Sequence, residues 1–163
     1  MRERSKPQRS TYDRALDMLE ARARGADELK RLLLRKGEPP ADVDATLERL
    51  IASGLIDDAN YARQVARSKA LGAGMSRRRI QLELTRRGVA KDVSTEAIDD
   101  VFEHEGVDEA AAIERVARKK LRTLAKLDLP TQKRRLYAFL ARRGYDSDDI
   151  SNVLRNVIGS DAE

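Results

Sequence analysis

The sequence predicts an all-α protein built as a tandem array of three three-helix repeats. The main evidence is an internal repeat centred on three glycines, Gly37, Gly88 and Gly144, each directly preceded by two basic residues. The glycines are 51 and 56 residues apart (88 − 37 and 144 − 88), so each unit has room for three helices. Composition points the same way, because 37% of the residues are charged and no β-rich stretch occurs. We therefore expect an elongated, curved, solenoid-like bundle, whose handedness the sequence does not determine.

Apolar residues recur at fixed distances from each glycine and predict a separate core for each repeat. They stand eight and four residues before the glycine, and again ten and thirteen residues after it. Spacings of four and three residues place both members of a pair on one face of a helix. The leucines four residues before the glycines, Leu33, Leu84 and Leu140, should therefore occupy equivalent buried positions.

The repeat alignment divides the chain into five segments. A basic tail at 1–11 precedes three-helix repeats at 12–56, 57–106 and 107–158, and a short tail at 159–163 follows them. No linker between repeats exceeds a few residues, so neighbouring repeats are expected to touch.

Local signals place helices in the first two repeats. The first repeat is expected to begin a helix at Tyr12 and another after Gly25, and proline chemistry places its third helix near Pro39-Pro40. In the second repeat, Asp57 or Asp58 is expected to cap the first helix by accepting backbone N–H groups, rather than to act in acid–base catalysis.

Two further signals concern the breaks between helices. Gly72 and Gly74 resemble a fragment of a phosphate loop, but no strand precedes them and no Gly-Lys-Ser/Thr follows, so we expect a flexible turn. In the third repeat, the first helix is expected to be the longest in the chain and to be ended by Pro130. Asp148 and Asp149 should cap the last helix.

Composition excludes several classes of protein. The chain has no cysteine, so it has neither a disulfide framework nor a thiolate metal site. No apolar run is long enough to span a membrane. The N-terminal MRERSKPQRS is basic but lacks the apolar core of a secretory signal, so we expect a cytoplasmic protein.

Catalytic and metal-binding patterns are absent from the sequence. The only histidine, His104, stands between two glutamates and has no nucleophile with which to form a catalytic set. The acidic positions 96, 99, 100 and 103 lack the Asp/Asn-Gly loop of a calcium site. We therefore predict a binding protein with no catalytic residue, metal or cofactor, and keep a small enzyme only as the weakest alternative.

Charge is sorted along the chain and indicates an extended, charged partner. The net charge is +5 over 77–91, −8 over 92–109 and +8 over 115–135, although a single cluster is equally consistent with a solvated helix face. Only six residues are Tyr or Phe, which favours contact with a phosphate backbone or an acidic protein surface over base recognition. The residues predicted to bind the partner are Arg77, Arg78, Arg79, Arg86, Arg87, Lys119, Lys120, Arg134 and Arg135.

Two motifs suggest a family. They are Leu-Ile-Asp-Asp-x-x-Tyr-Ala at 55–62 and Gly-x-x-x-x-x-Ile-x-x-x-Leu-x-x-x-Gly at 74–88, preceded by YDRALDMLEARARGADELKRLLLRKG from Tyr12. In this order and spacing they resemble the bacterial RecX family, regulators of the RecA recombinase. The resemblance extends to about Ile158 and is weakest in the third repeat. Gly25 stands where the family commonly has a serine, so a capping box with Glu28 is lost.

The resemblance implies a specific function. It implies a tandem array of three-helix repeats that binds the RecA filament on single-stranded DNA. The protein would inhibit RecA ATP hydrolysis, strand exchange and co-protease activity, and so modulate recombinational DNA repair and the SOS response. We expect a monomer with at most weak direct DNA binding. The alternative is a helical-repeat protein that binds nucleic acid without sequence preference and without RecA.

Overall fold

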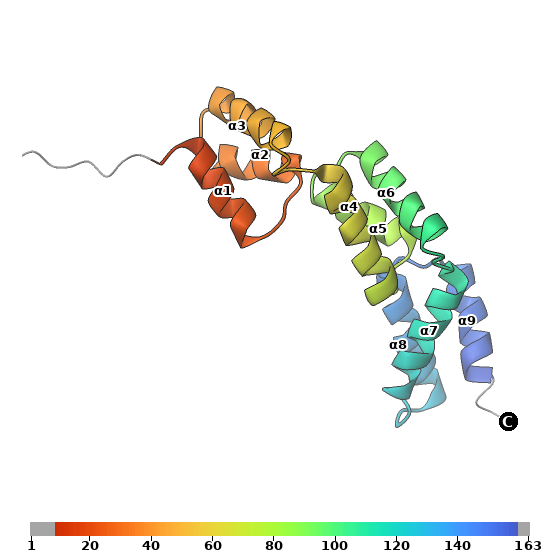
Figure 1. Cartoon of the computed structure of the whole chain (residues 1–163). Coiled ribbons are helices and arrows are strands. Elements are labelled where there is room, and N and C mark those ends of the chain that lie inside the picture. The colour runs from red at the N-terminus through yellow and green to blue at the C-terminus, as the bar shows by residue number, and fades with distance from the viewer. Residues whose placement is uncertain (1–8, 160–163) are drawn as a thin grey trace, which may run out of the picture.

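Residues 9–159 are described by a computed structural model and form nine α-helices and one π-helical turn, without a strand in that range. The helices lie in three groups of three along an elongated, bent array (Figure 1), so the predicted all-α class is confirmed. Their bounds are α1 Thr11–Ala21, α2 Ala26–Arg35, α3 Pro40–Ala52, α4 Asp58–Arg67, η1 Ser68–Gly72, α5 Arg77–Arg86, α6 Lys91–His104, α7 Glu109–Arg122, α8 Leu129–Arg142 and α9 Ser147–Gly159.

Most of the two predicted tails, 1–11 and 159–163, lies outside the described residues, because the structure describes neither 1–8 nor 160–163. Within 9–159, none of the helices is both long and apolar enough to cross a membrane.

Several helices begin at a polar side chain that caps their free backbone N–H groups, as short polar residues do at this position. Ser10 opens α1 with a full capping box, and Asp57 caps α4, one of the two predicted alternatives. The cap of α9 was assigned wrongly: Asp146 accepts the N–H groups of both Asp148 and Asp149. The two predicted residues are donors in the first turn instead.

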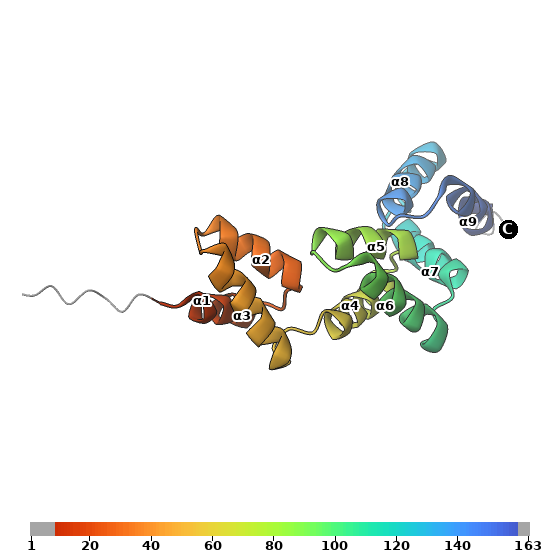
Figure 2. The same cartoon turned by 90° about the horizontal axis from the view of Figure 1, so that it is seen from above.

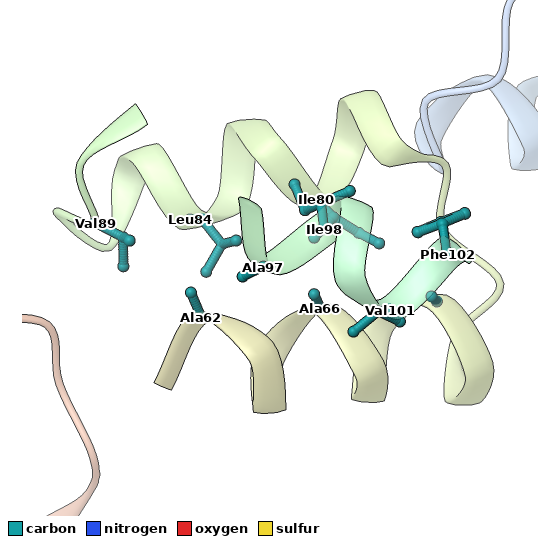
Figure 3. Close-up of a cluster of buried hydrophobic side chains, with 10 residues drawn as sticks. Ala62, Ala66, Ile80, Leu84, Val89, Ala97, Ile98, Val101 and Phe102 are labelled. Carbon is teal, nitrogen blue, oxygen red and sulfur yellow. The ribbon is translucent and has the colours of Figure 1, made fainter. Parts of the chain in front are cut away.

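Each three-helix group has its own apolar core. Leu33, Leu84 and Leu140 are all fully buried, one in each core, so their predicted equivalence is confirmed. Figure 3 shows the second core, in which α5 is packed against α4 and α6. The side chains that meet there are Ala62, Ala66, Ile80, Leu84, Val89, Ala97, Ile98, Val101 and Phe102.

The third repeat departs from the prediction in its first two helices. α7 ends at Arg122, and Pro130 lies in the first turn of α8 instead of ending α7. Proline is tolerated there because the first N–H groups of a helix have no intrahelical partner. α8 begins 15 residues before Gly144 (144 − 129), whereas α2 and α5 each begin 11 before their glycine (37 − 26 and 88 − 77). The extra turn of this repeat therefore belongs to its second helix.

The second helices of the repeats follow one another end to end. In Figure 2, α2 and α5 lie along one side of the array with α8 beyond them, and each helix start faces the end of the next second helix. The C-terminal glycine of α5 thus meets the start of α2, and that of α8 meets the start of α5. This order pairs the negative end of one helix dipole with the positive end of another.

The first joint, between repeats 1 and 2, is held at the start of α2. The N–H of Ala26 donates to Oδ1 of Asp58 at 2.9 Å. Gly88 has a φ of +78°, and a Cβ added to it would lie 2.8 Å from both Asp27 Cβ and Glu28 N. Only glycine combines this left-handed backbone with so close an approach. Partial burial raises the pKa of Asp58, although its hydrogen bond from Ala26 acts in the opposite direction.

The second joint, between repeats 2 and 3, repeats this arrangement at the start of α5. The N–H of Arg77 donates to Oε1 of Glu109 at 3.1 Å. Gly144 has a φ of +88°, and a Cβ there would lie 2.6 Å from Arg79 Cβ and from Ser76 Oγ. Asp58 and Glu109 are both the first residue of the first helix in their repeat. The two joints therefore use equivalent residues for equivalent contacts.

The second joint has additional bonds that make it the tighter of the two. The N–H of Ser76 donates to the Arg143 carbonyl, and the Tyr145 hydroxyl donates to the Gly74 carbonyl, each at 3.0 Å. Burial raises the pKa of Tyr145 to about 12, so it is a neutral donor. Gly74, with a φ of +58°, is pressed against Val116, where any Cβ would overlap the valine side chain. Of the two glycines of the expected flexible turn, Gly74 is therefore buried and closely packed, whereas Gly72 is exposed.

Candidate partner-binding surface

A basic cleft lies at the first joint, between residues of two repeats. It has a volume of about 620 Å³, and its lining residues are Arg22, Glu28, Arg31, Leu32, Arg35, Arg86 and Arg87. Arg31 and Arg35 are one helical turn apart on α2, and Arg86 enters from the end of α5. The Arg31 guanidinium donates to the Arg86 carbonyl at 3.3 Å, which fixes one wall of the cleft to the other.

The cleft is strongly cationic because the carboxylate of Glu28, the one acidic residue that lines it, already forms ion pairs with arginines of the same repeat. Glu28 pairs with Arg22, and with Arg24 at 2.9 Å. Arg87 is held by Glu83 at 2.5 Å and by Tyr61 at 3.0 Å. Burial disfavours the charge of Arg87, but these two hydrogen bonds outweigh it and raise its pKa. Because these contacts hold its guanidinium, Arg87 forms part of the cleft wall and is not counted among the arginines available to a ligand.

Three guanidiniums of the cleft remain available to a ligand. Arg31, Arg35 and Arg86 are exposed, and within residues 9–159 none of them forms an ion pair. A planar guanidinium binds carboxylates and phosphates through paired hydrogen bonds, so three of them suit an acidic or phosphorylated chain.

Sequence reasoning identified only part of this cleft. It singled out Arg86 and Arg87 but not Arg22, Arg31 or Arg35. One signal was present, because Arg35 and Arg86 stand at the same position, two residues before the repeat glycine. Arg31 carries no such signal, since it joins the cleft only through the contact between repeats.

Four of the predicted binding residues are engaged by contacts or by packing within the chain. Arg77 pairs with Asp99 at 2.6 Å and stacks on Phe102, with 4.5 Å from guanidinium carbon to ring centroid. Arg79 is half-buried against Gly144, and its Nε is buried without a hydrogen-bond partner. Lys120 lies 5.4 Å from the centroid of Phe139. Arg87 is the fourth of these residues, as described above.

Arg77 and Arg78, both predicted to bind the partner, have different surroundings although they are adjacent in the first turn of α5. Arg77 is half-buried and bound to Asp99, whereas Arg78 is exposed. A helix turns about 100° per residue, so adjacent arginines face different surroundings.

The other five predicted cations are exposed, and no ion pair or ring contact is found for them in the described part of the chain. Arg78 and Arg86 belong to α5, Lys119 to α7, and Arg134 and Arg135 to α8. Only Arg86 lines the basic cleft, so the structure distributes these charges along the array instead of gathering them into one site.

An acidic groove of about 870 Å³ runs along α6, on the second repeat. His104 lines it, is 76% exposed in its side chain, and lies with Nδ1 3.0 Å from Asp100 Oδ1. No group of three or more His, Cys, Asp and Glu side chains able to hold a metal ion is found within residues 9–159. The other residues that line the groove are Arg63, Lys91, Asp92, Thr95, Glu96, Asp99 and Glu103.

These features define a tandem three-helix-repeat protein whose candidate functional surface is a set of charged faces. Three family models, described as the first, second and third three-helix domains of RecX, match residues 12–50, 57–98 and 108–154. The chain belongs to the RecX family.

Relatives and solved structures agree with this assignment. The regulatory protein RecX of Mycobacterium avium is 39% identical over 163 residues, which cover 98% of this chain and 92% of that protein. RecX of Pelodictyon phaeoclathratiforme is 33% identical over 144 residues, covering 88% and 86%. The crystal structure of RecX from Lactobacillus salivarius superposes with a TM-score of 0.69 at 18% identity, over 90% of this chain and 94% of that one. A second RecX crystal structure gives 0.70 at 22% identity, over 88% and 70%.

Proposed function

We propose that this protein binds the RecA filament on single-stranded DNA and inhibits RecA ATP hydrolysis, strand exchange and co-protease activity. It would thereby modulate recombinational DNA repair and the SOS response. Membership of a family of regulatory proteins supports a regulatory role. The observation that carries the proposal is the basic cleft, where two repeats together present three arginines that form no ion pair within residues 9–159.

The geometry suits a partner that is both long and acidic. Arg31 and Arg35 come from one repeat and Arg86 from the next, so the cleft exists only when both repeats are in place. Further exposed cations lie on α7 and α8, at the other end of the array. Several weak contacts on one array strengthen each other through effective concentration, which favours a polymer over a small ligand. Acting in this way, the protein needs no catalytic residue, and we propose that it works as a cytoplasmic monomer.

The same arginines favour one alternative, the binding of bare nucleic acid without RecA. Base stacking is not expected in that case, because the exposed rings are few. Phe102 is buried, and Arg143 lies over Phe139 at 3.7 Å from the ring centroid. Any contact with DNA would therefore be made with phosphates and would carry no sequence preference.

Co-sedimentation separates the two functions. The protein is spun with RecA filaments and with bare single-stranded DNA at two salt concentrations, and RecA ATP hydrolysis is measured in parallel. We expect strong binding to filaments, weak binding to bare DNA, and inhibition of hydrolysis. Arg86→Glu should weaken filament binding about tenfold, as expected when one charge-assisted contact is replaced by repulsion.

Lys126→Glu is the matched control. Lys126 is exposed in the turn between α7 and α8, and its reversal changes the net charge by the same amount without touching the cleft. Equal weakening by both variants would show that only net charge matters. Each lost phosphate contact should flatten the slope of log affinity against log salt concentration by roughly 0.7 for single-stranded DNA. If Arg86→Glu flattened this slope equally in the absence and in the presence of RecA, the protein would be a nucleic-acid binder.

A further inference from the structure

The second helices of the three repeats share an arginine-rich face. The positions 10, 6, 3 and 2 residues before each repeat glycine lie within about 100° around a helix, because each residue turns the helix by about 100°. In α2, α5 and α8 these positions hold six arginines and one acid, Asp27. We name these positions of the three helices the arginine track. Its arginines are Arg31, Arg35, Arg78, Arg86, Arg134 and Arg142.

The two joints connect the parts of the track in the same way. A Cβ on Gly88 would lie 2.8 Å from the backbone N of Glu28, and one on Gly144 would lie 3.1 Å from that of Arg79. Glu28 and Arg79 both stand nine residues before their own repeat glycine (37 − 28 and 88 − 79), so the helices dock alike at both joints. The basic cleft shows the result at the first joint, where α2 and the end of α5 line one hollow. The equivalent docking at the second joint continues the track from α5 onto α8 (Figure 2).

The chain leaves the arginine track available to a partner. All six arginines are exposed, and none of them forms an ion pair within residues 9–159. Their neighbours are used differently, because Arg77 binds Asp99 and Arg87 binds Glu83. With six cations and one acid, the track attracts a negatively charged surface, and its guanidiniums can bind carboxylates or phosphates through paired hydrogen bonds.

Two exposed leucines within the track favour carboxylates of a protein over phosphates of DNA. Leu34 is 38% exposed and stands three residues after Arg31. Leu82 is 46% exposed and stands four residues after Arg78 and four before Arg86. A phosphate backbone offers these leucines no apolar surface, whereas protein interfaces combine arginines with apolar side chains that leave water on binding.

From this combination we infer that the arginine track binds an acidic amphipathic segment of the RecA protomer, with carboxylates and apolar side chains on one face. The identity of the partner rests on the proposed function. The track assigns the contact to protein and not to DNA, and it spans all three repeats. Leu82 and Arg142, which the sequence did not single out, are contact residues on this surface.

Two pairs of variants test the charged and the apolar part of the track by co-sedimentation with RecA filaments. Arg142→Glu is matched by Arg122→Glu, because both arginines are exposed in the last turn of a helix and share any cost from the helix dipole. Arg122 lies off the track and lines a hollow between α7 and α8. Leu82→Gln is matched by Leu71→Gln, since Leu71 is 43% exposed and lies outside the second helices. Glutamine is a good helix former, so Leu82→Gln should fold, which circular dichroism checks.

We expect Arg142→Glu to weaken filament binding about tenfold and Leu82→Gln about fivefold, with less than a twofold change in the two controls. Binding of Leu82→Gln to bare oligodeoxythymidylate should equal that of the parent. Weakening by Arg142→Glu without weakening by Leu82→Gln would identify a phosphate backbone as the ligand and overturn the inference. Equal effects within either pair would also overturn it, and both results would leave the proposed function intact. Absence of filament binding by the unmodified protein would refute both.

Discussion

The glycines at the joints should matter for stability more than glycines with the same backbone elsewhere, and Gly144→Ala tests this. Gly144 and Gly54 have φ values of +88° and +72°. Alanine in a left-handed conformation costs about 1–2 kcal/mol, so both substitutions share this loss. They differ in their surroundings, because the new methyl group would lie 2.6 Å from Arg79 Cβ and Ser76 Oγ at position 144, whereas at position 54 no heavy atom of the described residues lies within 4 Å of it.

Relief of that overlap requires the second joint to open or to shift. Over-packing of this kind costs about 1–3 kcal/mol, which brings the expected loss in the free energy of unfolding to about 2–5 kcal/mol for Gly144→Ala. Gly54→Ala should lose only about 1–2 kcal/mol. The bonds from Ser76 to the Arg143 carbonyl and from Tyr145 to the Gly74 carbonyl would be strained in the first variant only.

Urea unfolding followed by circular dichroism measures the difference. In a repeat array, stability is the sum of repeat and interface contributions, so a weakened joint should also broaden or split the transition of Gly144→Ala. If the two variants lost equal stability, with equally sharp transitions, the close packing at Gly144 would contribute nothing and the account of the joints would be wrong.

Three further predictions use the same unfolding assay. Leu84→Ala should cost about 2–5 kcal/mol because Leu84 is fully buried in the second core, and a loss below 1 kcal/mol would contradict that burial. Arg77→Glu should lower the free energy of unfolding by about 1 kcal/mol through loss of its contacts with Asp99 and Phe102. Arg78→Glu should be neutral or slightly stabilising. Similar losses in both variants would show that the two arginines are equivalent. Asp58→Asn keeps the acceptor oxygen for the Ala26 N–H and removes a carboxylate whose pKa burial raises. A carboxyl group whose pKa is raised by folding disfavours the folded state at pH values above that pKa. Asp58→Asn should therefore be at least as stable as the parent at pH 7, and the difference should shrink as the pH falls through the folded-state pKa. A large loss of stability at pH 7 would show that the negative charge itself holds the joint.

The helices, their cores and most of their caps are determined by the sequence locally. Leu33, Leu84 and Leu140 were predictable as equivalent core residues because the pattern of a helix face repeats within a few positions of each glycine. The caps are short-range too, since Asp57 needs only a backbone N–H a few residues away. Where local signals compete, the prediction failed: Pro130 fits the end of one helix and the first turn of the next, and Asp128 decides between them as the N-cap of α8.

The joints and the candidate surface were decided by tertiary structure. Ala26 and Asp58, and likewise Arg77 and Glu109, are 32 residues apart, and nothing in either sequence neighbourhood marks them as partners. The basic cleft depends on the same contact, which brings Arg31 and Arg86 together across 55 residues. Charge counting found basic segments, but it treats adjacent arginines alike. Only the packing of α5 against α6 half-buries Arg77 beside Asp99 and leaves Arg78 exposed to solvent, because side-chain direction follows the helix turn and not the composition.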